Sequence, residues 1–191
     1  PLTAGTSTCD PTIGSNGNTT FPAAASPGFI ARLFSLPNCP SRACERLTVD
    51  HVGLTRTGKD GIVANGLASQ PVTINRVTIS NAATYGIRLV GADTLTMTNN
   101  TITGSGGTKY PAIYLSGVTG DFQGAINGNT GSTNGLNALV FHGVADNGLT
   151  WITPASSGAL GYMLAGALTV NGPFTSSGVV KVLRRAITVN A

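Results

Sequence analysis

The chain has 191 residues, of which only 9% are charged, and its formal net charge is +4. A typical globular protein has about 25% charged residues, so this surface must be polar mainly through Thr, Ser, Asn and Gly. The basic residues are scattered apart from Arg184 and Arg185, and no aromatic residues alternate with them, which argues against nucleic acid as a partner. No apolar run approaches the ~18 residues of a membrane-spanning helix, so we expect a protein that does not span a membrane.

Residues 1–45 lack the regular pattern of the rest of the chain, and we predict an irregular amino-terminal segment there. The three cysteines, Cys9, Cys39 and Cys44, all lie in this segment. No histidine lies nearby and the spacing is not that of a zinc site, so we expect a disulfide formed in an oxidising compartment. The pairing stays open, and three reduced cysteines are the alternative. The odd cysteine is either free or bonded to another chain.

From Leu47 onward, a pattern of three short alternating runs returns along the chain. In the first three repeats the first runs begin at Leu47, Val72 and Leu95, the second at Val52, Val77 and Asn100, and the third at Gly61, Gly86 and Ala112. Three strands per repeat, stacked repeat on repeat, are typical of a parallel β-solenoid. Later repeats are expected to start at Ala125, Leu149 and Leu168, which makes about six coils over residues 46–191. Residues 1–45 would then cap the first coil, or form a plain extra coil.

Alternation along each run predicts which side chains point into the solenoid. The predicted inward set is aliphatic: Leu47, Val49, Leu54, Ile62, Ala64, Val72, Ile74, Ile79, Ile87, Leu89, Leu95, Met97, Ile102, Ile113, Leu115, Val140 or its neighbours, Leu168, Val170, Val180 and Val182. The predicted outward threonine column is Thr48, Thr73, Thr96, Thr150 and Thr169.

Two corners of the coil carry residues suited to turns. Asn75, Asn99 and Asn100 lie at the first corner, where asparagine tolerates left-handed backbone and its amide can bond to the next coil. A glycine follows each third run, at Gly66, Gly91, Gly117, Gly143 and Gly166. These glycines predict a tight turn at the same corner of successive coils.

The runs 86–89 (Gly-Ile-Arg-Leu), 95–103 (Leu-Thr-Met-Thr-Asn-Asn-Thr-Ile-Thr) and 178–182 (Gly-Val-Val-Lys-Val) resemble coils of the right-handed parallel β-helix repeat family. The resemblance covers roughly residues 46–191. It implies an all-β fold, a single-stranded right-handed parallel β-helix, and the extracellular or cell-surface location of the family's secreted bacterial proteins. The family includes pectin-degrading enzymes, adhesins, phage tailspikes and structural rods, so the fold alone does not select an activity.

The seven acidic residues fall mostly at corners of separate coils, without the adjacent carboxylates that glycoside hydrolysis needs. We therefore expect neither enzymatic activity nor a cofactor or metal. Two groups are candidates for binding a glycan. Asp50 and His51 lie beside Arg76 of the next coil and could hold a glycan carboxylate, while Arg88 and Tyr114 share an outward column and could stack on a sugar. Incidental surface charge and ordinary packing are the alternatives for these groups.

The carboxyl-terminal residues Ala186, Ile187, Thr188, Val189 and Asn190 continue the strand pattern without a capping helix. An open β-edge templates another strand, and a head-to-tail contact between unlike ends propagates as a filament. We therefore expect an extracellular structural β-solenoid that self-associates into a filament or forms part of a longer cell-surface rod. A polysaccharide-binding or pectate-lyase-like β-helix is the alternative. Ice binding, suggested by the threonine columns, is the third hypothesis.

Overall fold

The computed structural model describes residues 12–13, 19–21, 47–55, 57–65, 71–91, 93–120, 126–152, 158, 160–177, 180–182 and 186–190. Within these ranges the regular structure is all strand, and the strands pair in parallel. The fold is therefore an all-β parallel solenoid, as predicted. Of residues 1–45, the structure describes only two short strands, residues 12–13 and 19–21. The three cysteines and the rest of the expected cap lie outside the described residues.

Each early coil contributes one strand to each of three faces. The first face holds β1 (Thr12–Ile13), β3 (Leu47–Asp50), β6 (Pro71–Asn75), β9 (Asp93–Thr98) and β12 (Ile126–Asn127). The second face holds β2 (Thr19–Phe21), β4 (Val52–Thr55), β7 (Thr78–Ser80), β10 (Thr101–Thr103) and β13 (Thr130–Ser132). The third face begins with β5 (Ile62–Asn65) and β8 (Ile87–Val90).

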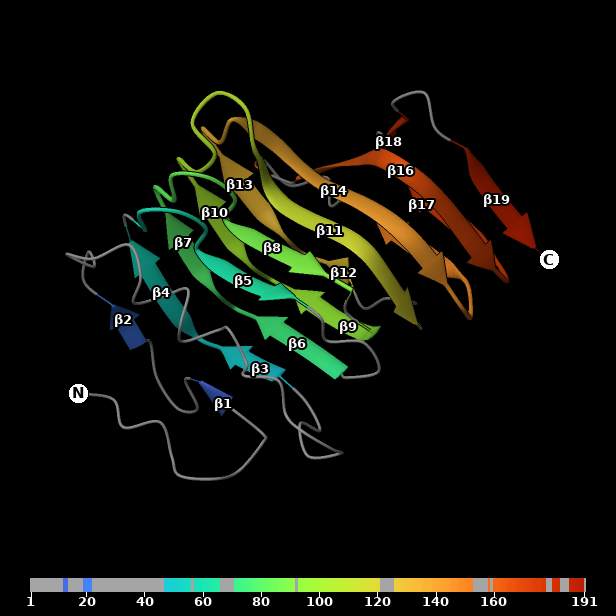
Figure 1. Ribbon diagram of the computed structural model, residues 1–191, viewed down its shortest axis with the longest axis horizontal. Coiled ribbons are helices and arrows are strands. Elements are labelled where there is room, and N and C mark those ends of the chain that lie inside the picture. The colour runs from blue at the N-terminus through green and yellow to red at the C-terminus, as the bar shows by residue number, and fades with distance from the viewer. Residues whose placement is uncertain are drawn as a thin grey trace.

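The later coils contain much longer strands. These are β11 (Pro111–Gly120), β14 (Leu136–Ala145) and β16 (Gly161–Asn171). Four short strands accompany them: β15 (Leu149–Ile152), β17 (Phe174–Ser177), β18 (Val180–Val182) and β19 (Ile187–Asn190). Figure 1 shows the strands stacked side by side along one axis, with β1 and β2 at one end and β19 at the other.

The predicted columns of the first three repeats are in register. Leu47 pairs with Val72, which pairs with Leu95, and the predicted threonine column begins as expected with Thr48, Thr73 and Thr96. On the third face Ile62, Ile87 and Ile113 are aligned. Equivalent side chains therefore stack on one another at the spacing of adjacent strands, about 4.8 Å.

The solenoid core is filled by the predicted inward residues. The described inward residues are buried: Val49, Leu54, Ile62, Val72, Ile74, Ile79, Ile87, Leu89, Leu95, Met97, Ile102, Ile113, Leu115, Leu168 and Val170. In β14 the inward residues are the neighbours of Val140, Leu139 and Phe141, because Val140 is aligned with the outward Tyr114. Burying one aliphatic side chain of this size contributes about 1.5–3 kcal/mol. The repeated aliphatic column thus supplies most of the driving force for stacking.

One predicted coil start is wrong. Leu149 does not stand on the first face, because its strand β15 pairs with β17 and aligns Leu149 with Phe174. The first-face position of that coil is taken by the end of β14, where Gly143 lies between Val118 and Leu168. The physical reason is that the chain passes from the third face to the first without a break in these coils, so the new coil starts inside a long strand.

The continuous strands of the late coils also affect the other positions predicted there. Leu168 does start a coil on the first face. Thr150 leaves the predicted threonine column because it pairs with Thr175, and Thr169 stacks between Val144 and Thr188. Ala125 lies outside the described residues.

The glycine corner is also only partly as predicted. Gly91 bends the chain between β8 and β9 with φ of 69°. Gly117 and Gly143 instead lie inside β11 and β14, at shifts in the pairing register, and both have positive φ. Gly117 is the extra residue of a β-bulge in β11, between the aligned pairs Ser116–His142 and Val118–Gly143, so the ladder continues past it instead of ending in a turn. Gly143 stays in the ladder, aligned with Val118 on one side and with Leu168 on the other. Gly166 lies within β16, and Gly66 is outside the described residues.

At the first corner, asparagine side chains tie the coils together from inside. Asn99 has the left-handed backbone expected of it, with φ of 56°. Asn100 is fully buried: its Oδ1 accepts from the backbone N–H of Val77 at 2.9 Å, and its Nδ2 donates to the carbonyl of Ile74 and to Oδ1 of Asn129. Buried backbone groups that the corner removes from the ladder are thereby satisfied.

Candidate functional site

The predicted site around Asp50 lies at the corner between the first and second faces. Asp50 ends β3 and His51 follows it, while Asn75 ends β6 one coil later and Arg76 follows in the same way. His51 and Arg76 both have left-handed backbone, with φ of 51° and 50°. The sequence therefore correctly placed Asp50, His51 and Arg76 together, and we call these residues with Asn75 and Thr98 the corner cluster.

Hydrogen bonds in the corner cluster converge on one carboxylate. His51 Nδ1 lies 2.9 Å from Asp50 Oδ2, and Asn75 Nδ2 donates to Asp50 Oδ1 at 2.9 Å. Arg76 donates to both carboxylate oxygens, from Nε at 3.4 Å and from Nη2 at 3.3 Å. Thr98 then donates to Asn75 Oδ1 at 2.8 Å. The chain of contacts spans three successive coils.

The electrostatics of the corner cluster favour a structural role, in which its side chains link successive coils. Burial opposes ionisation of Asp50, but hydrogen bonds from His51 and Arg76 and the charge of Arg76 outweigh it and lower the pKa of Asp50. Arg76 is thus engaged with a carboxylate of this protein, although half of its side chain stays exposed. A glycan carboxylate would have to compete with Asp50 for the same guanidinium.

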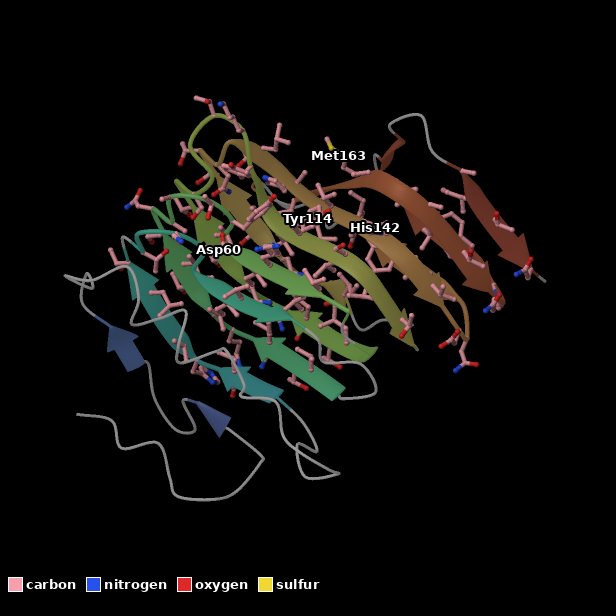
Figure 2. The ribbon with its side chains drawn as sticks, viewed as in Figure 1. Asp60, Tyr114, His142 and Met163 are labelled. Carbon is pink, nitrogen blue, oxygen red and sulfur yellow. The ribbon has the colours of Figure 1, made fainter. Side chains whose placement is uncertain are left out.

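A second group of side chains lies on the outside of the third face. Tyr85 precedes β8, Tyr110 precedes β11 and Tyr114 lies within β11. We call these three residues the tyrosine cluster. Figure 2 labels four residues on this side of the solenoid: Asp60 before β5, Tyr114 in β11, His142 in β14 and Met163 in β16. Strand β8 lies between the strands of Asp60 and Tyr114.

The rings of the tyrosine cluster are in contact. The ring centroid of Tyr85 lies 5.0 Å from that of Tyr110 and 5.3 Å from that of Tyr114, with interplanar angles of 56° and 37°. His142 continues the row at 6.2 Å from Tyr114 in an edge-on arrangement. Such offset and tilted rings are the favourable geometry for aromatic pairs.

An ion pair supports the tyrosine cluster from one side. The Arg88 guanidinium carbon lies 5.8 Å from the centroid of Tyr85, and Nη1 of Arg88 lies 3.7 Å from Oδ2 of Asp60. Asp60 also accepts hydrogen bonds from the Thr84 hydroxyl and from the backbone N–H of Tyr85. Burial, followed by the neighbouring Tyr114, raises the pKa of Tyr85, so its phenol is neutral at physiological pH.

The predicted pair of Arg88 and Tyr114 does share a column, since the two residues are aligned partners in β8 and β11. Their functional groups, however, both meet Tyr85, which the sequence reasoning did not single out. A signal for it existed: Asp60 and Tyr85 each stand directly before a glycine at the start of aligned third-face strands. Tyr110 offered no such signal, because it belongs to the loop before β11.

The predicted assembly edge is β19. It pairs with β16, aligning Ile187 with Leu168 and Val189 with Val170. Val170 is completely buried, whereas Val189, at the same inward position of the next coil, is 46% exposed. Ile187 is partly buried against the core, and Thr188 and Asn190 are exposed. Among the described strands none pairs with the other edge of β19.

Metal-binding clusters and membrane-spanning helices are both absent from the described residues. Within them no group of three or more His, Cys, Asp or Glu side chains is placed to hold a metal ion. The same part of the chain contains no helix of the length and apolar character needed to cross a bilayer.

Comparison with known proteins gives one match. The sequence model of a family described as "right handed beta helix region" matches residues 45–164 of the chain. No curated protein and no solved structure matches the chain. The matched range covers the three-faced early coils, β11, β14 and the beginning of β16.

Proposed function

We propose that this chain, which belongs to the right-handed β-helix family, is an extracellular structural solenoid whose edge strand β19 accepts a further coil. That coil comes from a second copy in a head-to-tail filament, or from additional repeats in a longer cell-surface rod. The observation that carries the proposal is the exposure of Val189, an inward residue stacked on the buried Val170.

Physical chemistry favours occupation of this edge. An unpaired strand edge presents a row of N–H and C=O groups that another strand can satisfy. Val189 would bury its exposed part against the next coil, and burial of apolar area contributes about 25 cal/mol per Å². With only 9% charged residues, the surface also repels other copies weakly. The cysteine content supports the extracellular location, since disulfides persist mainly in oxidising compartments.

The filament alternative is tested by measuring the sedimentation of the purified chain over a range of concentrations. Electron microscopy of the most concentrated sample accompanies this measurement. We expect rods that lengthen with concentration. Val189→Asp should abolish them, because a carboxylate at an inward position cannot be buried without a partner. A species that stays monomeric at every concentration would contradict the filament.

Thr188→Asp is the matched control. It places the same charge one residue away, on the outward side of β19, where Thr188 is exposed. It should leave assembly largely unchanged. Equal loss of assembly in both variants would mean that net charge, rather than the inward position, governs association. Circular dichroism of each variant checks that the solenoid itself is folded.

Polysaccharide binding is the second candidate, and the tyrosine cluster is the observation that favours it. Aromatic faces that recur at about the spacing of adjacent strands suit the apolar faces of successive sugar rings. Arg88 and Asp60 at its border can hydrogen-bond hydroxyl groups. Calorimetric titration with a neutral and with an acidic oligosaccharide tests this role. Tyr114→Ala should abolish binding while Arg76→Ala, in the corner cluster, should not, and the reverse result would move the site to that cluster.

A further inference from the structure

The four tyrosines of the chain fall into two environments. Tyr85, Tyr110 and Tyr114 form the tyrosine cluster on the outer surface, and Tyr110 is 37% exposed. Tyr162 lies in the core, where it is 5% exposed and its hydroxyl donates to the carbonyl of Ile126 at 3.3 Å. The cluster therefore brings three phenols together where a soluble oxidant can reach them, and the fourth is kept apart.

We propose that the tyrosine cluster is a site of oxidative cross-linking, in which Tyr85 forms a dityrosine bond with Tyr110 or Tyr114 of the next coil. This modification goes beyond the structural role proposed above, because it concerns the covalent joining of coils within one chain. The required oxidant is hydrogen peroxide acting through a haem peroxidase or an equivalent one-electron oxidant.

Coupling of two tyrosines is a two-electron oxidation. Each of two tyrosines loses one electron to the oxidant and its phenolic proton to water, which leaves two phenoxyl radicals. The radicals couple through the ring carbons next to the oxygen-bearing carbon, forming one C–C bond. The hydrogen on each coupled carbon then moves to the oxygen, which restores both phenols. In sum two tyrosines and one hydrogen peroxide give one dityrosine and two water molecules.

The geometry favours coupling within the chain over coupling between chains. Ring centroids 5.0 and 5.3 Å apart place both partners in contact with Tyr85 before the radicals form. A pair held in contact reacts as one body, and its effective concentration far exceeds that of a second protein molecule in dilute solution. With interplanar angles of 56° and 37°, the rings are tilted against each other and are not stacked face to face.

A cross-link here would join the coil containing β8 to the coil containing β11. Such a bond restricts the unfolded chain more than the folded one, in the way a disulfide does, and so it should raise the unfolding temperature. The cross-link would lie where the coils of three short strands are followed by the first long strand, β11.

Trypsin provides a direct readout, because cleavage sites separate the partners. Cleavage after Arg76, Arg88 and Lys109 places Tyr85 in peptide 77–88 and both other cluster residues in peptide 110–181, with the tyrosine-free peptide 89–109 between them. The dilute protein is treated with peroxidase and peroxide, and the monomer band is digested. We expect dityrosine fluorescence in that band and a linked product of 77–88 with 110–181. Tandem mass spectrometry assigns the second ring.

Tyrosine-to-phenylalanine variants sharpen the test. Tyr85→Phe should abolish the product that contains peptide 77–88, and Tyr110→Phe with Tyr114→Phe should do the same when combined. Tyr162→Phe is the control and should leave the yield unchanged. The proposal is overturned by dityrosine found only in dimers or larger species. A product that involves Tyr162, or an unchanged monomer that lacks dityrosine, overturns it equally.

Discussion

The early coils (up to β10) differ from the late coils (from β11 onward) in how the chain passes from one face of the solenoid to the next. In the early coils three short strands are separated by corners, and the buried side chain of Asn100 satisfies backbone groups there. In β11, β14 and β16 the third and first faces run together in strands of ten or eleven residues, and the pairing register shifts within them, as at the extra residue Gly117.

This difference indicates what each kind of coil depends on. A corner interrupts the ladder of backbone hydrogen bonds, so it needs side chains that replace the missing partners. A bulged strand keeps most of its ladder but needs a residue without a Cβ where it passes close to its neighbour. Side-chain amides should therefore be critical at the corners, where Asn129 and Asn134 of the following coil act as Asn100 does, and glycines should be critical in the long strands.

The largest expected effect is in the early coils, at Asn100. Asn100→Ala leaves the backbone N–H of Val77 and the carbonyl of Ile74 without their side-chain partner inside the core. Each unsatisfied buried group costs about 1–3 kcal/mol, so the free energy of unfolding should fall by about 3 kcal/mol. Urea denaturation measures it. Asn99→Gly is the control: Asn99 is exposed and has positive φ, so glycine should be tolerated, and equal losses would refute the role of the buried amide.

The next effect tests the late coils. Gly143 has φ of 148°, and a Cβ there would collide with the carbonyl of Val118. Gly143→Ala should therefore lower the free energy of unfolding by at least about 2 kcal/mol, from backbone strain and steric overlap. Gly117→Ala, also at positive φ but with open space around the added Cβ, should cost only about 1 kcal/mol. Equal costs in urea denaturation would mean that the close approach of Gly143 to Val118 imposes no special restriction.

A third effect concerns a contact within the late coils, from Tyr162 in β16 to Ile126 in β12. Burial raises the pKa of Tyr162 from 10.0 to about 12. Because the folded pKa is the higher one, the stabilisation is complete below pH 10 and is lost as pH rises towards 12. Tyr162→Phe should cost about 1 kcal/mol at neutral pH, through the lost hydrogen bond. It should also weaken the alkaline loss of stability seen by thermal unfolding. An unchanged alkaline profile would assign that loss to other groups.

The smallest effect lies in the corner cluster. The pKa of Asp50 is lowered from its ordinary 3.8, so its contribution to stability is present above that value and disappears as pH falls through the lowered pKa. Ion pairs near the surface contribute up to about 1 kcal/mol, and Asp50→Asn should cost no more than that at neutral pH. The variant should also flatten the acid limb of the stability profile in thermal unfolding. An acid limb as steep as that of the unaltered protein would show that Asp50 does not contribute to it.

The corner cluster could be predicted from the sequence, whereas the tyrosine cluster could be predicted only in part. Asp50, His51 and Arg76 follow alternating runs that are aligned one coil apart, and parallel in-register stacking converts that spacing into contact. Arg88 and Tyr114 were found in the same way. Tyr85 and Tyr110 lie just outside the alternating runs, so their place depends on how the loops before β8 and β11 fold back over the third face.

By itself, the sequence determined the parallel stacking, the inward aliphatic columns and the alignment of the early coils. It could do so because a repeat brings equivalent residues to equivalent positions, and period-two alternation assigns each one to a side. Only the tertiary structure decided that β14 and β16 continue around the corner and that Leu149 belongs to another sheet. A glycine supports either a turn or a bulge, and the choice depends on which neighbouring strand its backbone can pair with.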